Sequence, residues 1–278
     1  MRPGQPSVQD RQPASAGIDL ATLTDVGTER DHNEDACGSL AAGDAVVLAV
    51  ADGVSSNLGG EVASQMAIEV LLRAYAEEPG DRPAGQRLYR AVQQANIEVY
   101  DRSIAVPELH GMATTLVALV VEGGALTAVH VGDSRLYLCR EGRTVQLTKD
   151  HTVAAERMRL GMLSAEKARV HPDRSTLTRS LGRELIVSRD RLSQPLAQGD
   201  VLIACSDGLY NVLGDEELGA LAAGAGDAAA ACRDLIGAAN RRGTGDNVTA
   251  GVVRVHGRQP EPPARPGLAG RLRRLLGG

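Results

Sequence analysis

The sequence predicts an α+β domain, in which antiparallel strands form a sheet that helices cover. Two apolar runs, at 45–53 and 200–208, each suit a buried strand, and each ends in Asp-Gly before a helical pattern. Residues 60–78 and 82–104 repeat apolar positions at helical spacing. Residues 111–148 are typical of strands separated by glycine-containing turns. Because a helix with one apolar face must bury it, we expect the helices to lie on a sheet.

The composition permits one large domain with tails and excludes several classes of protein. The 278 residues are 43% hydrophobic, lack Phe and Trp, and carry a net charge of -5. No nucleic-acid partner is expected, because such binding relies on a basic surface. The four cysteines are scattered without a C-x-x-C pair, and no apolar stretch suits a membrane span or a signal peptide. We therefore expect a cytoplasmic protein with reduced thiols.

The first segments of the chain differ sharply in character. Residues 1–16 are rich in Pro, Gln and Ser, so we expect a disordered leader before a domain that spans 17–256. Residues 18–27 alternate well enough for a strand. The acid-rich segment 28–38 is either a solvated loop or part of a site. The Asp-Gly that follows would by itself favour a hairpin turn, but no second alternating run comes after Gly53.

The segment 111–148 is predicted to be a meander of antiparallel hairpins, with three strong strands and a weaker one. Its turns are Glu-Gly-Gly, Gly-Asp-Ser and Glu-Gly. Asp133 lies in the Gly-Asp-Ser turn, where Asp and Ser also serve plain turn structure. Residues 149–182 are polar and broken by Gly161 and Pro172, which predicts an irregular surface insertion of short helices and loops.

The last third of the chain contains the second Asp-Gly unit and then one short and one longer helix. Asp227 is the expected N-cap of the longer helix. A glycine-rich turn then carries Asp246 and Asn247 into a final strand. Residues 257–278 form a Pro-rich linker and a short basic segment, with five Arg against one Glu. Its leucines on one helical face suit an acidic membrane or a partner groove, whereas its shortness favours a frayed, solvated tail.

Acidic residues gather at the strand ends and turns of this predicted fold. They are Asp52, Asp133, Asp207 and Asp246, with Glu34 and Asp35 near the start of the domain. Carboxylates brought together without basic partners would repel one another and raise their pKa values, and a cation resolves that conflict. Oxygen ligands suit Mg²⁺ or Mn²⁺ better than zinc. Two such ions about 3.5–4 Å apart would activate a shared water and hold a phosphoryl group, for which Arg30 is a two-pronged donor.

Nine short motifs follow one another between about residue 18 and residue 255. They are TDVGTERDHNED (24–35), VADG (50–53), GEVAS (60–64), GMATTL (111–116), VGDSR (131–135), LTKDHT (147–152), LTRSLG (177–182), CSDGL (205–209) and GDNVT (245–249). Each motif is weak alone, but in this order they resemble the metal-dependent serine/threonine protein phosphatases of type 2C, bacterial branch. The resemblance implies a four-layer α-β-β-α sandwich, two antiparallel sheets face to face between helices, with a metal centre in the cleft at one end.

The resemblance also implies a role for each acid of the two-metal centre. Asp52 resembles the carboxylate that bridges two Mn²⁺ or Mg²⁺ ions, and the carbonyl of Gly53 binds one of them. Asp207 and Asp246 resemble ligands of the other ion.

Further roles are implied around this pair of ions. Glu34 and Asp35 resemble acids that hold metal-bound waters, and Asp133 resembles the ligand of a third, weaker metal. Arg30 resembles the phosphate-binding arginine. Residues 153–176 match the mobile flap that borders the substrate cleft.

The implied reaction is direct attack of a metal-bridging hydroxide on the phosphorus of phosphoserine or phosphothreonine, without a phosphoenzyme. The metals lower the pKa of that water, and together with Arg30 they neutralise charge on the phosphoryl oxygens. Asp52 and Arg30 are thus the expected catalytic residues. The expected partners are phosphorylated proteins, including a cognate Ser/Thr kinase or its substrates.

One stretch departs from the family pattern. Residues 54–57 are Val-Ser-Ser-Asn, where many bacterial members have Met-Gly-Gly-His and some eukaryotic members place a histidine acid. The group that protonates the leaving alkoxide therefore stays open between a metal-bound water and His32, and His151 is expected to be a structural hydrogen-bonder. This departure supports the alternative of a catalytically inactive member that binds phosphoproteins or regulates. Against that alternative, every expected acid is present.

Overall fold

The strand β4 (Ala45–Val54) shows how one apolar run serves two cores. The computed structural model describes residues 8–9 (backbone only), 17–54 and 59–257. Val46 and Leu48 face a core between two sheets, whereas Val47 and Ala49 face a second core beneath helices. Successive side chains of a strand point to opposite faces, so a strand buried on both faces is apolar without alternation.

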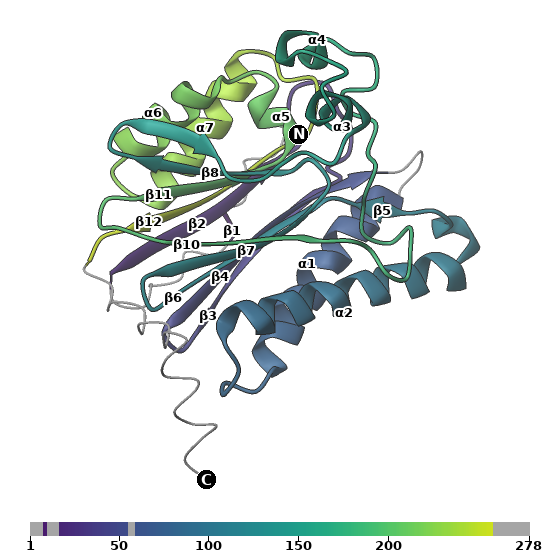
Figure 1. The fold of residues 1–278 in the computed structure, drawn as a ribbon, viewed down its shortest axis with the longest axis horizontal. Coiled ribbons are helices and arrows are strands. Elements are labelled where there is room, and N and C mark those ends of the chain that lie inside the picture. The colour runs from purple at the N-terminus through teal and green to yellow at the C-terminus, as the bar shows by residue number, and fades with distance from the viewer. Residues whose placement is uncertain (1–7, 10–16, 55–58, 258–278) are drawn as a thin grey trace, which may run out of the picture.

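The first sheet has the strand order β10-β7-β6-β4-β3, and β5 pairs with the end of β4. Besides β4, its strands are β3 (Asp35–Ala42), β5 (Ala113–Thr114), β6 (Leu116–Glu122), β7 (Ala125–Val131) and β10 (Asp190–Pro195). The helices α1 (Gly59–Glu77) and α2 (Ala84–Ala105) cover its outer face, and a short 3₁₀ helix, η1 (Pro107–Leu109), follows them. The predicted pair of long helices is therefore confirmed (Figure 1).

The second sheet has the strand order β1-β2-β12-β11-β8-β9. Its strands are β1 (Val8–Gln9), β2 (Ile18–Asp25), β8 (Arg135–Arg140), β9 (Arg143–Gln146), β11 (Val201–Cys205) and β12 (Val248–Val255). The helices α5 (Asp207–Tyr210), α6 (Asp215–Gly224) and α7 (Ala228–Arg241) lie on its outer face. The predicted N-cap of α7 is confirmed, because the Asp227 carboxylate accepts a hydrogen bond from the amide of Ala230.

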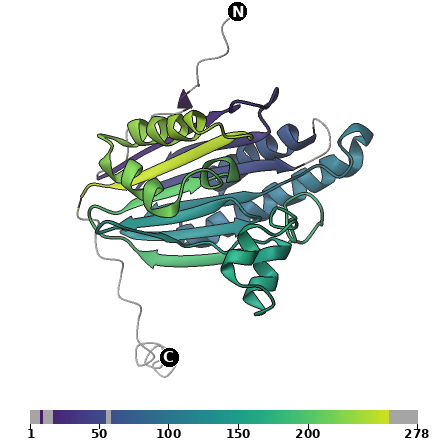
Figure 2. The ribbon, with the colours of Figure 1, turned by 90° about the horizontal axis from the view of Figure 1, so that it is seen from above.

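Three separate cores define four layers. One lies between α1, α2 and the first sheet, one between the two sheets, and one between the second sheet and α5 to α7. The two views show the sheets stacked, with α1 and α2 on one outer side and α6 and α7 on the other (Figures 1 and 2). All strand pairs within the sheets are antiparallel. The predicted α-β-β-α sandwich is confirmed.

The predicted hairpin at Gly-Asp-Ser was wrong. The strand β7 pairs with β6 and β10 in the first sheet, whereas β8 pairs with β11 and β9 in the second. Gly132 to Ser134 therefore carry the chain from one sheet to the other. Gly132 has a φ of +99°, which permits the sharp change of direction. Residue types that favour turns do not distinguish a hairpin from a crossing between stacked sheets, which explains the error.

The predicted insertion contains α3 (Val153–Arg159) and α4 (Ala165–Arg169). At the N-terminus, Val8–Gln9 pairs with β2, within the segment expected to be a disordered leader. The remainder of that leader, residues 55–58 and the basic tail from 258 onward lie outside the described residues. Within the described part of the chain, no helix is both long and apolar enough to cross a membrane.

Candidate metal centre at the end of the sandwich

Two carboxylates face each other where β3 begins and β4 ends. Asp35 and Asp52 are direct cross-strand partners, and Cys37 and Val50, two residues along each strand, point into the core between the sheets. The alternation of side chains therefore places both acids on the inter-sheet side. Like charges directly opposite on adjacent strands destabilise a sheet, so this pairing favours a site that binds a cation.

Asp207 comes from the other sheet, as the first residue of α5 directly after β11. The neighbouring hydroxyl of Ser206 donates to the Asp35 carboxylate at 2.6 Å and accepts from the amide of Thr249 at 3.0 Å. The Asp207 carboxylate accepts from the side-chain amide of Asn211 at 3.0 Å. Acids of both sheets are thus held at the same end of the sandwich.

Asp133 lies on the crossing between β7 and β8, and hydrogen bonds of three hydroxyl groups fix this crossing. Tyr210 donates to the carbonyl of Asp133 at 3.1 Å. The hydroxyls of Thr115 and Ser134 are 2.6 Å apart, and Thr115 also accepts from the amide of Asp52 at 3.0 Å. The backbones that carry Asp52 and Asp133 are therefore linked through one threonine.

Arg30 and Asp246 form an ion pair at the rim of this group, with 2.9 Å between Nη2 and Oδ2. Both side chains keep substantial solvent exposure, at 49% and 39%. The adjacent Asn247 is buried, and its side chain accepts from the amide of Glu34 and donates to the carbonyls of Val26 and His32. Asn247 thus fixes the loop that carries Arg30 and Glu34.

Glycines allow the backbones to approach one another closely here. A Cβ atom on Gly53 would lie 2.1 Å from the carbonyl oxygen of Gly60, and one on Gly208 would lie 2.0 Å from that of Asn247. Neither position can accept a larger residue without a backbone shift. The Gly residues of both Asp-Gly units are therefore required by packing of the site itself.

The electrostatics of the group are those of acids crowded together away from water. Burial is the largest cause of each upward shift, and neighbouring carboxylates add to it. The pKa rises to about 7 for Asp35, to about 8 for Asp133 and to about 6 for Asp207. The pKa of Asp52 is also raised well above its usual value by burial, with contributions from all three and from Asp246. Asp52 thus interacts electrostatically with each of these four acids.

These side chains fit divalent cations of the hard, oxygen-binding class. Within the described residues, no three His, Cys, Asp or Glu side chains converge closely enough to enclose an ion by themselves. Mg²⁺ and similar ions retain several waters and use few carboxylates, so a closed protein cage is not required. The raised pKa values supply the positive argument, because a bound cation would relieve the repulsion among Asp35, Asp52 and Asp207.

The sequence identified the acids of this group but missed the residues that hold them. Asp35, Asp52, Asp133 and Asp207 interact electrostatically with one another, while Glu34 interacts with Arg30 and Asp246. Burial raises the pKa of Glu34, and Arg30 opposes this shift. The supporting residues that sequence reasoning did not assign are Asn247, Thr115 and Ser206. Each belongs to one of the nine motifs, and each lies beside an acid in the sequence or in space. Membership of a motif was therefore the signal that could have identified them.

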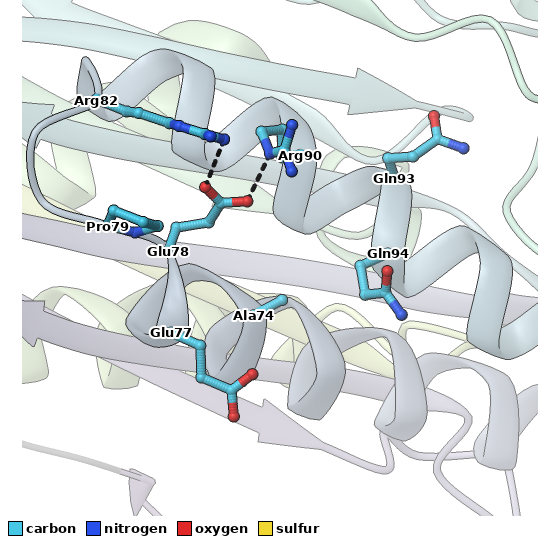
Figure 3. A pocket seen from close by; sticks show the side chains of 8 residues that line it. All are labelled: Ala74, Glu77, Glu78, Pro79, Arg82, Arg90, Gln93 and Gln94. Carbon is cyan, nitrogen blue, oxygen red and sulfur yellow. Dashed lines mark hydrogen bonds and ion pairs between the residues drawn. The ribbon is translucent and has the colours of Figure 1, made fainter.

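A surface pocket elsewhere on the molecule does not belong to this group. It lies between α1 and α2, has a volume of about 440 Å³, and is lined by residues that include Glu78, Arg82 and Arg90 (Figure 3). Both arginines bond to the Glu78 carboxylate, so these three charges pair with one another. The pocket is at the opposite end of α1 from Gly60, roughly 20–27 Å away along the helix at 1.5 Å per residue.

The sandwich and its acids define a class of protein that holds divalent cations between two sheets to act on an anionic group. The protein phosphatase 2C family model matches residues 28–237. The chain belongs to this family.

Individual relatives agree with this assignment. The serine/threonine phosphatase stp of Listeria monocytogenes is 35% identical over 234 residues, which cover 83% of this chain and 93% of that protein. The serine/threonine phosphatase PstP of Mycobacterium tuberculosis has a crystal structure that matches with a TM-score of 0.79 at 33% identity, over 87% of this chain and 100% of that one. A structure of the PstP catalytic domain in complex with two manganese ions matches with a TM-score of 0.76, also at 33% identity, over 87% and 99%.

Proposed function

We infer that this protein is a metal-dependent serine/threonine phosphatase that hydrolyses phosphoserine and phosphothreonine in other proteins. The observation that carries the inference is the group of mutually repelling, buried carboxylates around Asp52, drawn from both sheets. The family membership and the names of the relatives agree with it. Its substrates are phosphoproteins.

The proposed site fits two Mn²⁺ or Mg²⁺ ions, which Asp52, the carbonyl of Gly53, Asp207 and Asp246 would hold. Glu34 and Asp35 would hold coordinated waters, and Asp133 would serve a third, weaker ion. When bound, such ions supply an activated water nucleophile and neutralise phosphoryl charge. The two-manganese PstP structure supports this number of ions. These residue assignments are proposals.

Arg30 is proposed to orient the substrate phosphate. Its guanidinium is exposed and bonds to Asp246 at 2.9 Å, next to the acids. A phosphate bound there would offer oxygens in the two-pronged geometry that arginine prefers, and Asp246 would then be free to bind a cation. Asn247 would keep Arg30 in place by holding the backbone at His32 and Glu34.

The experiment is a Mn²⁺ titration of phosphate release from a phosphothreonine peptide. We expect no release in EDTA, release that saturates with Mn²⁺, and loss of release in Asp52→Asn and Asp207→Asn while the circular dichroism spectrum is unchanged. Undiminished turnover in either variant would refute the metal assignment. Binding of the peptide without release at any Mn²⁺ concentration would instead favour the alternative of an inactive phosphoprotein-binding member, which no comparison supports.

Some finer features also remain proposals. A Ser/Thr kinase or its substrates is the proposed physiological target, which removal of phosphate from an autophosphorylated kinase would test. The cytoplasm is the proposed compartment, supported by four buried cysteines that form no disulfide. The division into a leader (1–16), a phosphatase domain (17–256) and a linker with a basic tail (257–278) is likewise proposed. So is contact of that tail with a membrane or a partner.

A further inference from the structure

The crossing from Gly132 to Ser134 is held from one side by a single dipeptide, Asp150-His151. The Asp150 carboxylate binds the guanidinium of Arg135 through two nitrogens, at 3.0 and 2.7 Å. That guanidinium lies 3.6 Å from the centre of the Tyr210 ring, whose hydroxyl donates to the carbonyl of Asp133. Asp150 therefore acts on the crossing through two intermediate side chains.

His151 contacts the crossing directly, through two hydrogen bonds with Gly132. The amide of Gly132 donates to Nδ1 of the His151 ring at 3.1 Å, and the amide of His151 donates to the carbonyl of Gly132 at 2.8 Å. The His151 residue is only 4% exposed. A buried side chain with this double contact fixes the backbone directly before Asp133.

The first of these bonds determines which ring nitrogen of His151 carries the proton. Because Nδ1 accepts from Gly132, a neutral ring must carry its proton on Nε2. Nε2 lies 3.4 Å from the carboxylate of Asp190, which can accept a hydrogen bond from it. Arg179 lies 3.3 Å from the same nitrogen and also pairs with Asp190 at 3.0 Å. With Nε2 protonated, the guanidinium of Arg179 cannot donate a hydrogen bond to the ring. It supports the ring indirectly, through its ion pair with Asp190. His130 packs on the other side, with its ring centre 4.7 Å away.

The same residue closes the base of the insertion that spans 153–176. The carbonyl of His151 accepts from the amide of Thr178 at 2.8 Å, and the amide of Val153 donates to the carbonyl of Thr176 at 2.9 Å. These bonds join the two chains that enter and leave the insertion. Arg179, one residue further on, bonds to Asp190 beside the His151 ring. The backbone of His151 thus holds the insertion while its ring holds the crossing.

We propose that His151 is a positioning residue that couples the insertion at 153–176 to the carboxylate of Asp133. A shift of the insertion would move the His151 backbone, and the ring would transmit this movement to Gly132 and so to Asp133. In the reverse direction, a cation on Asp133 would fix the crossing and restrain the insertion, because linkage between two sites is reciprocal. This inference rests on the proposed role of Asp133 as the ligand of a third cation.

The test measures Mn²⁺ binding by calorimetry and, separately, the rate at which trypsin cuts the insertion at Arg157, Arg159, Lys167 or Arg169, using the full chain. In the wild type we expect a weak Mn²⁺ binding event that Asp133→Asn removes, and slower cleavage once this site is filled. His151→Leu should weaken that event by about tenfold or more, as loss of groups that orient metal ligands does. It should also abolish the protection by Mn²⁺.

A conservative variant and a control separate positioning from general damage. The amide oxygen of Asn can accept from Gly132 but cannot reach Asp190, so His151→Asn should recover most of the weak Mn²⁺ affinity. His110→Leu, at an exposed histidine, should match the wild type in both measurements. If His151→Leu does not fold, Asp190→Asn carries the test, because it removes the carboxylate that faces Nε2, and cleavage in Mn²⁺ should then be faster than in the wild type.

Two results would overturn the inference, and they differ in what else they remove. If the wild type binds the weak ion and a folded His151→Leu keeps both its affinity and the protection, His151 does not couple the two parts. If the wild type shows no weak Mn²⁺ binding that Asp133→Asn removes, no cation binds at Asp133 for His151 to couple to the insertion. In that case the proposed third-cation role of Asp133 fails as well.

Discussion

At the scale of single residues, the site depends on side chains that touch no reacting group. Asn247 satisfies one amide and two carbonyls of the loop that carries Arg30 and Glu34. Without this side chain, the same amide and carbonyls would need water as a partner, and the loop would have to move to admit it. This residue therefore connects folding stability with the placement of the proposed phosphate-binding arginine.

We expect Asn247→Ala to lower the free energy of unfolding by about 2–4 kcal/mol, since three hydrogen bonds of a buried side chain are lost. The KM for a phosphopeptide should rise more than kcat falls, because Arg30 would bind substrate from a less ordered loop. Urea unfolding and steady-state kinetics measure the two effects. An unchanged KM in a destabilised variant would show that the loop does not position Arg30.

The acids of the site have the opposite effect on stability. Asp52→Asn should raise the melting temperature of the metal-free protein, because it removes a buried carboxylate whose pKa is raised by burial and by its acidic neighbours. The stabilisation by Mn²⁺ should shrink in the same variant. Thermal unfolding with and without Mn²⁺ gives both values, and Asp81→Asn, at an exposed turn, serves as the control. A lower melting temperature without metal would contradict the view that these acids repel one another.

At the scale of elements, two glycines in neighbouring helices should respond to alanine in opposite directions. A Cβ on Gly219 of α6 would lie 1.8 Å from the hydroxyl oxygen of Thr144 in β9, whereas one on Gly237 of α7 meets only the end of the Arg241 side chain at 3.2 Å. We expect Gly219→Ala to destabilise by about 1–3 kcal/mol through overpacking. Gly237→Ala should stabilise by up to about 1 kcal/mol through helix propensity. Urea midpoints of the two variants provide the measurement, and equal responses would mean that α6 does not approach β9 so closely.

At the scale of the whole molecule, the acid group should set how stability depends on pH. Asp207, Asp35 and Asp133 have folded pKa values of about 6, 7 and 8, above the unfolded value of 3.8, so the folded state binds more protons in this range. Their contribution to stability is present at low pH and is lost as pH rises through those values. Burial lowers the pKa of His130 to about 3, which opposes this trend only below its unfolded pKa of 6.5. Above pH 6.5 the carboxylates act without that opposition.

The metal-free protein should therefore melt at progressively lower temperature between pH 6.5 and pH 8.5, and saturating Mn²⁺ should remove that decline. Differential scanning calorimetry at several pH values in EDTA and in Mn²⁺ tests this. A flat profile in EDTA would indicate that the acids are not crowded in the folded state.

Much of this fold could be predicted from local patterns, because long runs with clear periodicity determine their own elements. The strands β4 and β11, the helices α1 and α2, and the cap at Asp227 are of this kind. The crossing at Asp133 and the bond from Ser206 to Asp35 were not predictable in the same way. They depend on which sheet a strand joins and on contacts between residues 171 positions apart. Neither is encoded in nearby residues.

The two ends of the sandwich differ in how the chain passes through them. At the end with the acids, the chain moves between the sheets, at the loop of Arg30 and at Asp133. At the other end, tight turns with left-handed glycines, Gly43 and Gly123, join β3 to β4 and β6 to β7, and residues 196–200 cross from β10 to β11. Foreign segments, such as a reporter peptide or a whole added module, are tolerated best at exposed turns, as the turn at Gly43 is. The glycine end is thus the place where this scaffold can be extended, by evolution or by an engineer, while its chemistry at the other end is left intact.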